Sequence, residues 1–137
     1  MLRTCLVSYF LLIISFALAQ APAMEKDTST APAVNQLVFT TTPDEARSLA
    51  RIDLTNGEPY LILPGSLAPV VYASEPRFEE AYQVRYYYRG CTGAEYTLVA
   101  AYNEVVLDHL QQYFSRRWRR LIRRDVIGFR DWRRSRR

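Results

Sequence analysis

Three side chains of this sequence have the types needed for nucleophilic catalysis, namely Cys91, His109 and Asp125. A cysteine thiolate can attack an electrophilic carbon, a histidine can act as its general base, and an aspartate can orient the imidazole. Cys91 directly follows a predicted strand, but an unpaired cysteine is also a common buried apolar side chain. The spacing fixes no geometry between the three residues, so we favour a protein that is not an enzyme. A small hydrolase or transferase that uses Cys91 and His109 is the alternative.

The sequence predicts neither a metal site nor a cofactor. It contains one histidine, and its cysteines and acids show no spacing typical of metal ligands. The turn at 64–66 lacks the further glycines and the lysine of a phosphate-binding loop. His109 falls at the centre of a predicted apolar helix face, which favours a core histidine. Asp125 falls on the apolar side of the last predicted helix, where we expect it to accept hydrogen bonds from an arginine or from backbone donors.

The C-terminal end carries a strong positive charge. Residues 115–137 hold 11 arginines against two aspartates, whereas residues 20–114 carry a net charge of −6. Guanidinium groups bind phosphates and carboxylates through paired hydrogen bonds, so this end should attract an anionic membrane surface or an acidic envelope partner. A solvated helix face that neutralises the acidic body is the alternative. The predicted binding residues are Arg116, Arg117, Arg119, Arg120, Arg123 and Arg124.

The first 19 residues are typical of a cleavable signal peptide. Arg3 precedes an apolar run from Leu6 to Leu18, and Ala17-Leu18-Ala19 fits the small-x-small pattern of signal peptidase sites. The run is shorter than the roughly 20 residues needed to cross a bilayer, so an uncleaved membrane anchor is the less favoured alternative. We therefore expect an exported protein, periplasmic or secreted, with no nucleic acid as its partner. The sequence leaves its oligomeric state open.

Composition divides the rest of the chain into three parts. Residues 20–35 are rich in Ala, Pro, Thr and Ser and predict a flexible tether. Residues 36–129 are long enough for one domain and too short for two ordinary ones. Residues 130–137 form a basic tail without a core-forming pattern.

The first half of the domain predicts a strand, a helix and a second strand. The run 37–40 is rich in β-branched and aromatic residues and suggests a peripheral strand. Thr42 followed by Pro43 and two acids is typical of a helix start, and we expect this helix to run to about Leu54, before the Asn56-Gly57 stop. The short apolar run 59–63 predicts a buried strand.

The second half predicts a crossover followed by two helices. Residues 67–72 form an edge strand or an ordered loop, residues 74–82 a helix with Phe78, Ala81 and Tyr82 on its apolar side, and residues 84–88 a strand with alternating faces. Such a β-α-β unit places its two strands in parallel. Two further helices are expected, at 97–114 and from Ser115 to a terminator at Gly128. The expected packed face of the first helix consists of Leu98, Tyr102, Val105, His109 and Tyr113. The fold class is α/β, with α+β as an alternative: a small sheet covered by helices, with a helical Arg-rich C-terminus.

The segment Phe78-Glu79-Glu80-Ala81-Tyr82 is similar to the Phe-Glu-Lys-Lys-Tyr signature of the FEKKY domain, a family of secreted or membrane-attached proteins of Bacteroidetes-type bacteria. The similarity covers roughly residues 43–129, including Val84 to Cys91, Ala101-Tyr102-Asn103 and Trp118 to Phe129. Glu80 and Ala81 depart from the signature, since lysines are usual there. The resemblance implies that the first part of the Arg-rich helix belongs to the domain. It implies no particular activity, ligand or catalytic residue.

Overall fold

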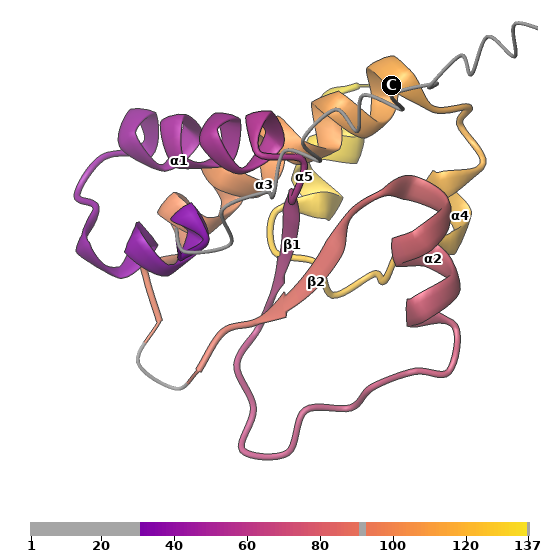
Figure 1. The fold of residues 1–137 in the computed structure, drawn as a ribbon, viewed down its shortest axis with the longest axis horizontal. Coiled ribbons are helices and arrows are strands. Elements are labelled where there is room, and N and C mark those ends of the chain that lie inside the picture. Colours follow the sequence, from indigo (N-terminus) through magenta and orange to yellow (C-terminus); the bar gives the residue numbers. More distant parts are fainter. Residues whose placement is uncertain (1–30, 91–92, 137) are drawn as a thin grey trace, which may run out of the picture.

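The computed structural model describes residues 31–90 and 93–136, so the expected signal peptide and Cys91 lie outside the described residues. Within them, the elements in chain order are η1 (Ala33–Phe39), α1 (Pro43–Thr55), β1 (Tyr60–Leu63), α2 (Glu75–Tyr82), β2 (Arg85–Tyr88), α3 (Tyr96–Tyr113), α4 (Trp118–Leu121) and α5 (Phe129–Ser135). The protein is therefore a mixed α/β domain in which helices cover a small sheet, as the sequence predicts (Figure 1).

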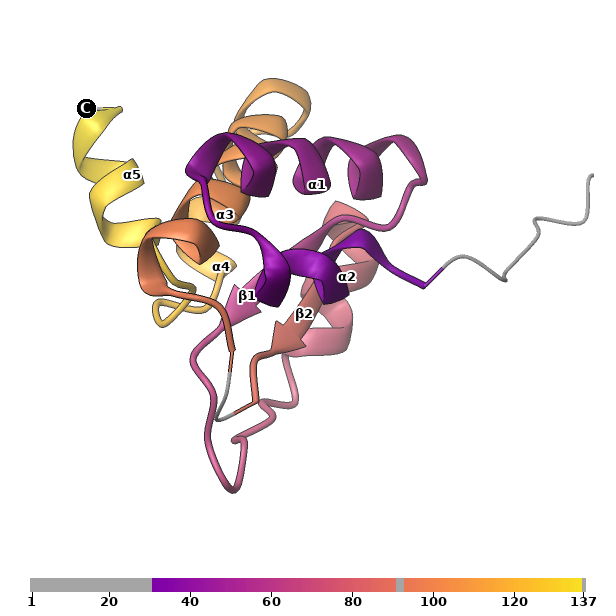
Figure 2. The same cartoon turned by 90° about the vertical axis from the view of Figure 1, so that its left-hand side faces the viewer.

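The two strands are parallel, with Tyr60 opposite Arg85 and Leu63 opposite Tyr88. This confirms the predicted crossover, since the chain leaves the end of β1, forms α2 and re-enters the sheet in the same direction. The helices η1 and α1 lie on one side of the sheet and α2 lies on the other, while α3 packs against α1 and β1 (Figures 1 and 2). Both strands therefore end at the same edge of the sheet.

Side chains cover the outer edges of this short sheet. On β1, the Asn103 side chain accepts a hydrogen bond from Ile62 N at 2.9 Å and donates to Ile62 O at 3.0 Å and to Ile127 O at 2.9 Å. On β2, the carboxylate of Glu79 accepts a hydrogen bond from Tyr86 N at 2.7 Å. A two-stranded ribbon alone is only marginally stable, so these contacts replace the strands that would otherwise flank it.

The predicted start of α1 is confirmed. Thr42 accepts a hydrogen bond from Glu45 N, the Glu45 carboxylate accepts one from Thr42 N, and Pro43 occupies the first helical position. These contacts satisfy backbone donors that the first turn of a helix leaves without partners. After the helix, Gly57 adopts a left-handed φ of 75°, as the Asn56-Gly57 pair predicts.

The predicted strand at 37–40 is wrong, since Ala33–Phe39 is a 3-10 helix. The buried carboxylate of Asp53 accepts hydrogen bonds from Ala33 N at 2.7 Å, from Val34 N at 2.9 Å and from the Tyr102 hydroxyl at 2.6 Å. This long-range anchor outweighs the local β propensity of the run. Ala33 and Val34 are buried, so these two residues of the expected tether belong to the core.

The buried face of α3 is rotated from the predicted one. Tyr113 is 65% exposed, while Val105 and His109 are only half-buried. Asn103 is fully buried, because its amide bonds the edge of β1. Because this buried residue is polar, a pattern based on hydrophobicity does not place it on the packed face of the helix. The residues that α3 buries are Leu98, Val99, Ala101, Tyr102, Asn103, Val106, Leu107 and Leu110.

The predicted helix from Ser115 to Gly128 is wrong. Its α-helical part is the single turn α4, after which Ile122 is extended with ψ 145°. Gly128, with φ 79°, precedes α5 instead of ending a helix, and a Cβ added there would lie 2.9 Å from the Cβ of Ala100. The expected tail contains all of α5 except Phe129, and α5 buries Trp132 at 5.5 Å from Trp118 between ring centroids. This aromatic contact favours two short helices over one continuous helix.

Ala81, a predicted apolar position, and Leu121 are also exposed. Ala81 lies on the exposed side of α2, whereas Phe78 and Tyr82 are buried as predicted. Leu121 is 51% exposed at the end of α4. The segment 67–72 is a loop, one of the two alternatives for it, and it projects away from α1 at the bottom of Figure 1.

Candidate functional site

The structure describes two of the three candidate catalytic residues, His109 and Asp125. Cys91 lies outside the described residues, and the described part of the chain has no hydrogen bond between His109 and Asp125. The His109 ring lies 4.7 Å from the Tyr113 ring and 6.4 Å from the Phe114 ring between centroids, and burial lowers its pKa. Residues 31–90 and 93–136 include no group of three or more His, Cys, Asp or Glu side chains that could hold a metal ion.

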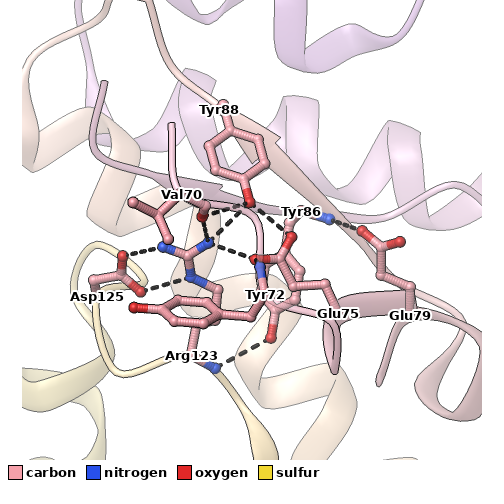
Figure 3. A network of polar contacts seen from close by, with 8 residues as sticks. All are labelled: Val70, Tyr72, Glu75, Glu79, Tyr86, Tyr88, Arg123 and Asp125. Atoms are coloured by element: carbon pink, nitrogen blue, oxygen red, sulfur yellow. Dashed lines mark hydrogen bonds and ion pairs between the residues drawn. The ribbon is translucent and has the colours of Figure 1, made fainter. Parts of the chain in front are cut away.

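Arg123 is the centre of an extensive cluster of polar contacts beside the sheet, which we call the Arg123 network (Figure 3). Its Nε donates to Asp125 Oδ1 at 2.9 Å, and its Nη2 donates to the other oxygen of the same carboxylate. Its Nη1 donates to Glu75 Oε1 at 2.6 Å. Side-chain exposure is 11% for Arg123 and 5% for Glu75, so this ion pair is largely withdrawn from water. The expectation that Asp125 accepts hydrogen bonds from a neighbouring arginine is confirmed, although Asp125 itself is exposed.

Two tyrosines of β2 and the loop before α2 complete the Arg123 network. The Tyr88 hydroxyl donates to Glu75 Oε2 at 2.6 Å, and the Tyr86 hydroxyl accepts a hydrogen bond from Arg123 N at 3.1 Å. Arg123 Nη1 also donates to Val70 O at 2.8 Å, and its guanidinium lies 4.8 Å from the centre of the Tyr72 ring. The network therefore ties the segment after α4 to β2 and to the end of the loop between β1 and α2.

The charges of the Arg123 network are fixed at neutral pH. Burial alone would raise the pKa of Glu75, but hydrogen bonds from Tyr72 N, Tyr88 and Arg123 lower it overall. The bond from Arg123 lowers the pKa of Asp125, and the two acids together raise the pKa of Arg123. Burial and the bond to Glu75 raise the pKa of Tyr88 to about 12. None of these groups is poised to exchange a proton near neutral pH, so the network suits a positioning role better than acid-base catalysis.

A hollow of about 340 Å³ lies beside this network, at the edge where both strands end. Pro64 directly follows β1 and Arg89 directly follows β2, and both line it. Arg124 and Arg130 line it from the segments before and within α5. We call this cavity the basic hollow; its remaining lining residues are Tyr96, Asp125, Val126, Ile127 and Gly128.

The basic hollow has an excess of positive charge. Three arginines line it against one acid, Asp125, whose carboxylate is already held by Arg123. In parallel sheets, ligands commonly bind outside the carboxyl ends of the strands, because the following loops converge there. Several guanidinium groups around one cavity can bind an anion such as a phosphate through paired hydrogen bonds.

The backbone holds Arg89 in place at the edge of the basic hollow. Arg89 Nη1 donates to Ala94 O, and a Cβ added at Gly93 would lie 2.0 Å from Arg89 Cγ. Its buried Nε has no hydrogen-bond partner within the part of the chain that the structure describes. A side chain larger than that of glycine at position 93 would therefore displace the arginine.

The predicted basic residues differ in their exposure and in their contacts. Arg116, Arg117, Arg120 and Arg124 are exposed, as a binding surface requires. Arg123 is engaged in its network. The remaining one, Arg119, is half-buried, with its guanidinium 4.9 Å from the centre of the Trp132 ring.

Arg89 and Arg130 are not among the predicted binding residues. Arg89 directly follows the predicted strand 84–88, and Arg130 is the first residue of the predicted basic tail. The position of Arg89 just past the end of a parallel strand is the signal that points to it, since such positions commonly face a ligand.

A larger hollow, of about 590 Å³, lies at the opposite end of the strands and is lined by Glu58, Glu79, Glu80 and Arg85 among others. The Glu79 carboxylate already accepts the hydrogen bond from Tyr86 N that closes the edge of β2. Glu79 therefore has a structural role in this hollow. Among the described residues, no further feature of the hollow indicates which ligand its acidic side chains would bind. The basic hollow remains the better candidate site.

The described residues include no helix with both the length and the apolar character needed to cross a membrane. The FEKKY resemblance and the expected export stay predictions. Comparison of the chain with protein-family models, with curated proteins and with solved structures found no match.

Proposed function

We propose that this protein is a non-enzymatic binding module that recognises an anionic group, of phosphate type, in the basic hollow. The observation that carries the proposal is the convergence of Arg89, Arg124 and Arg130 at the carboxyl edge of the parallel sheet. One carboxylate faces them, and Arg123 holds it. An anion entering the hollow would meet uncompensated guanidinium groups in a concave site, where hydrogen bonds to charged groups are strongest.

The other exposed arginines support this function from a distance. Arg116, Arg117 and Arg120 form no ion pair within the described residues and add positive potential to the same C-terminal third of the chain. Long-range attraction of this kind raises the rate at which an anion arrives, while contacts inside the hollow set its affinity. Export would place this module in the bacterial envelope, where anionic surfaces are its natural targets.

The test is a titration of the purified protein with pyrophosphate, followed by calorimetry. Replacing one hollow arginine in Arg124→Gln or Arg130→Gln should weaken binding by about tenfold, because each loses a charge-assisted hydrogen bond. Arg117→Gln is the matched control, since it removes the same charge from an exposed position that does not line the hollow. If Arg117→Gln weakens binding as much as Arg124→Gln, the protein attracts anions through diffuse charge and the hollow is not the site.

A further inference from the structure

The loop between β1 and α2 exposes a cluster of apolar side chains. Exposed fractions are 96% for Leu67, 60% for Val70, 66% for Val71 and 53% for Tyr72. We call residues 67–72 the apolar loop. It forms the outermost part of the molecule on the side away from α1 (Figures 1 and 2). Four large apolar residues gathered in six positions at the tip of one loop are unusual for a surface that faces only water, and such patches commonly mark a binding surface.

The fold holds this loop open at both ends. At its start, Gly65 lies so close to the end of β2 that an added Cβ would be 2.2 Å from Arg89 O and 2.6 Å from Gly90 O. At its end, Arg123 Nη1 donates to Val70 O at 2.8 Å, and Tyr72 N donates to Glu75 Oε1 at 2.8 Å. The Arg123 network therefore fixes the backbone of an exposed apolar segment, which is an arrangement that core packing does not explain.

Basic side chains stand next to the apolar loop. Pro64, which leads into the loop, lines the basic hollow together with Arg89, Arg124 and Arg130. Exposed apolar side chains close to a basic hollow match the two layers of an anionic bilayer, whose headgroups carry phosphate and whose interior takes apolar groups. A tyrosine at the boundary, as at Tyr72, suits the interface between them.

We infer that the apolar loop inserts into the surface of an anionic lipid bilayer while the basic hollow binds a phosphate of a lipid headgroup. The inference rests on the proposed function and names the source of the anion. Leu67, Val70 and Val71 supply the buried apolar area, and the arginines supply the preference for anionic lipids. The Arg123 network holds the backbone of the loop at Val70 and Tyr72, so less conformational entropy is lost when the loop inserts.

Fluorescence quenching by brominated lipids tests the depth of the loop directly. In Leu67→Trp the new indole should lose fluorescence on vesicles of phosphatidylglycerol and brominated phosphatidylcholine. Ile52→Trp is the matched control, because Ile52 is an apolar residue, 49% exposed, of α1, and α1 lies on the side of the molecule away from the apolar loop (Figure 1). Trp118 and Trp132 are buried. Their fluorescence is a constant background, which is measured on the unaltered protein.

A second pair of variants tests the energetic contribution of the loop. Leu67→Ser combined with Val71→Ser should lower the partition coefficient into the same vesicles by about tenfold or more, since two exposed apolar side chains no longer leave water on binding. Ile52→Ser should leave it unchanged. Both loop positions are exposed, so thermal unfolding of the variants should match that of the unaltered protein.

The outcomes separate this inference from the proposed function. Equal quenching of Leu67→Trp and Ile52→Trp, or unchanged partitioning of the loop variant, would overturn insertion. If the protein binds pyrophosphate but no vesicles, membrane insertion is wrong and the proposed function stands. If it binds neither pyrophosphate nor vesicles, both the insertion and the proposed function are wrong. If light scattering shows a dimer that the loop variant converts to a monomer, the apolar loop joins two copies of the chain and the inference is wrong.

Discussion

Arg123 Nη1 lies 2.6 Å from Glu75 Oε1 and so joins two residues that are 48 positions apart in the chain. The same guanidinium also donates hydrogen bonds to the Asp125 carboxylate and to the carbonyl oxygen of Val70. One side chain thereby connects the segment after α4, the start of α2 and the end of the apolar loop. Because the pair is mostly withdrawn from water, loss of Arg123 leaves the Glu75 carboxylate without an opposite charge, whereas loss of Glu75 leaves Arg123 paired only with Asp125.

Replacing either partner of this ion pair should destabilise the fold. Arg123→Met or Glu75→Gln should lower the free energy of unfolding by about 3 kcal/mol, as expected for breaking a largely buried ion pair. The double variant should lose less than the sum of the two, because the only charge it leaves unpaired is that of the more exposed Asp125. Urea unfolding measures these changes. Arg124→Gln, an exposed neighbour, should change the free energy by less than about 0.5 kcal/mol, and an equal effect of Arg124→Gln and Arg123→Met would contradict this role.

Acid should destabilise the protein through the same carboxylates. The pKa values of Glu75 and Asp125 are lowered in the folded state from 4.5 and 3.8. Their contribution to stability is therefore complete above these ordinary values and is lost as the pH falls through the lower values of the folded state. Urea unfolding between about pH 7 and about pH 3 measures the loss, which should be smaller in Glu75→Gln. A slope that is identical in Glu75→Gln and the unaltered protein would show that other groups cause it.

Asn103 should be essential to the edge of the sheet. Asn103→Leu leaves Ile62 N, Ile62 O and Ile127 O without their side-chain partner, and we expect a loss of about 3 kcal/mol in the free energy of unfolding. Hydrogen exchange at the Ile62 amide should also become faster. Gln112→Leu makes a similar change at an exposed position of α3 and serves as the control. Unchanged protection at Ile62 would show that β1 does not need this contact.

Two glycines at the carboxyl edge of the sheet provide a matched pair. Gly65→Ala places a Cβ 2.2 Å from Arg89 O, so the backbone must shift. We expect the free energy of unfolding, measured by thermal unfolding, to fall by about 2 kcal/mol. Gly90→Ala meets nothing within 4 Å among the described residues and should be neutral or slightly stabilising. Equal unfolding temperatures for the two variants would mean that the loops at this edge are not closely packed. Gly65→Ala should also weaken vesicle binding, since it displaces the start of the apolar loop.

Asp53 should hold η1 on the domain. In Asp53→Asn an amide faces the amides of Ala33 and Val34 and the Tyr102 hydroxyl, so the three hydrogen bonds cannot all be kept. We expect a loss of about 2 kcal/mol in stability and faster proteolysis within residues 33–39. Asp44→Asn, at a position where the side chain is 94% exposed, is the control. Equal proteolysis of both variants would indicate that η1 is held by its apolar contacts alone.

The sequence predicts those elements whose signals are local. The Thr42, Pro43 and Glu45 cap gives the start of α1, the apolar run gives β1, and the alternation of side chains gives β2. The parallel arrangement of the strands follows from the length of the connection between them. For the start of α1 and for the two strand segments, the signal lies within a few residues, so the order of residues is enough to reveal it.

Only the tertiary structure decided which polar residues enter the core. Asn103 turns α3 toward the edge of β1, and Asp53 draws the segment from Ala33 into a 3-10 helix. The contact of Trp118 with Trp132 divides the expected last helix into two short ones. Each of these outcomes depends on a partner at least 14 residues away in sequence, which periodicity and propensity do not register.

The candidate site shows the same division. Composition alone determined that the C-terminal end of this protein is basic and its body acidic. Which arginines converge was decided by the parallel sheet, because it brings Arg89 from the end of β2 to Arg124 and Arg130, while Arg123 is held by Glu75 and Asp125. The charge of a segment follows from its residue types alone. A binding site also requires short distances between those residues, and packing between segments far apart in the chain sets those distances.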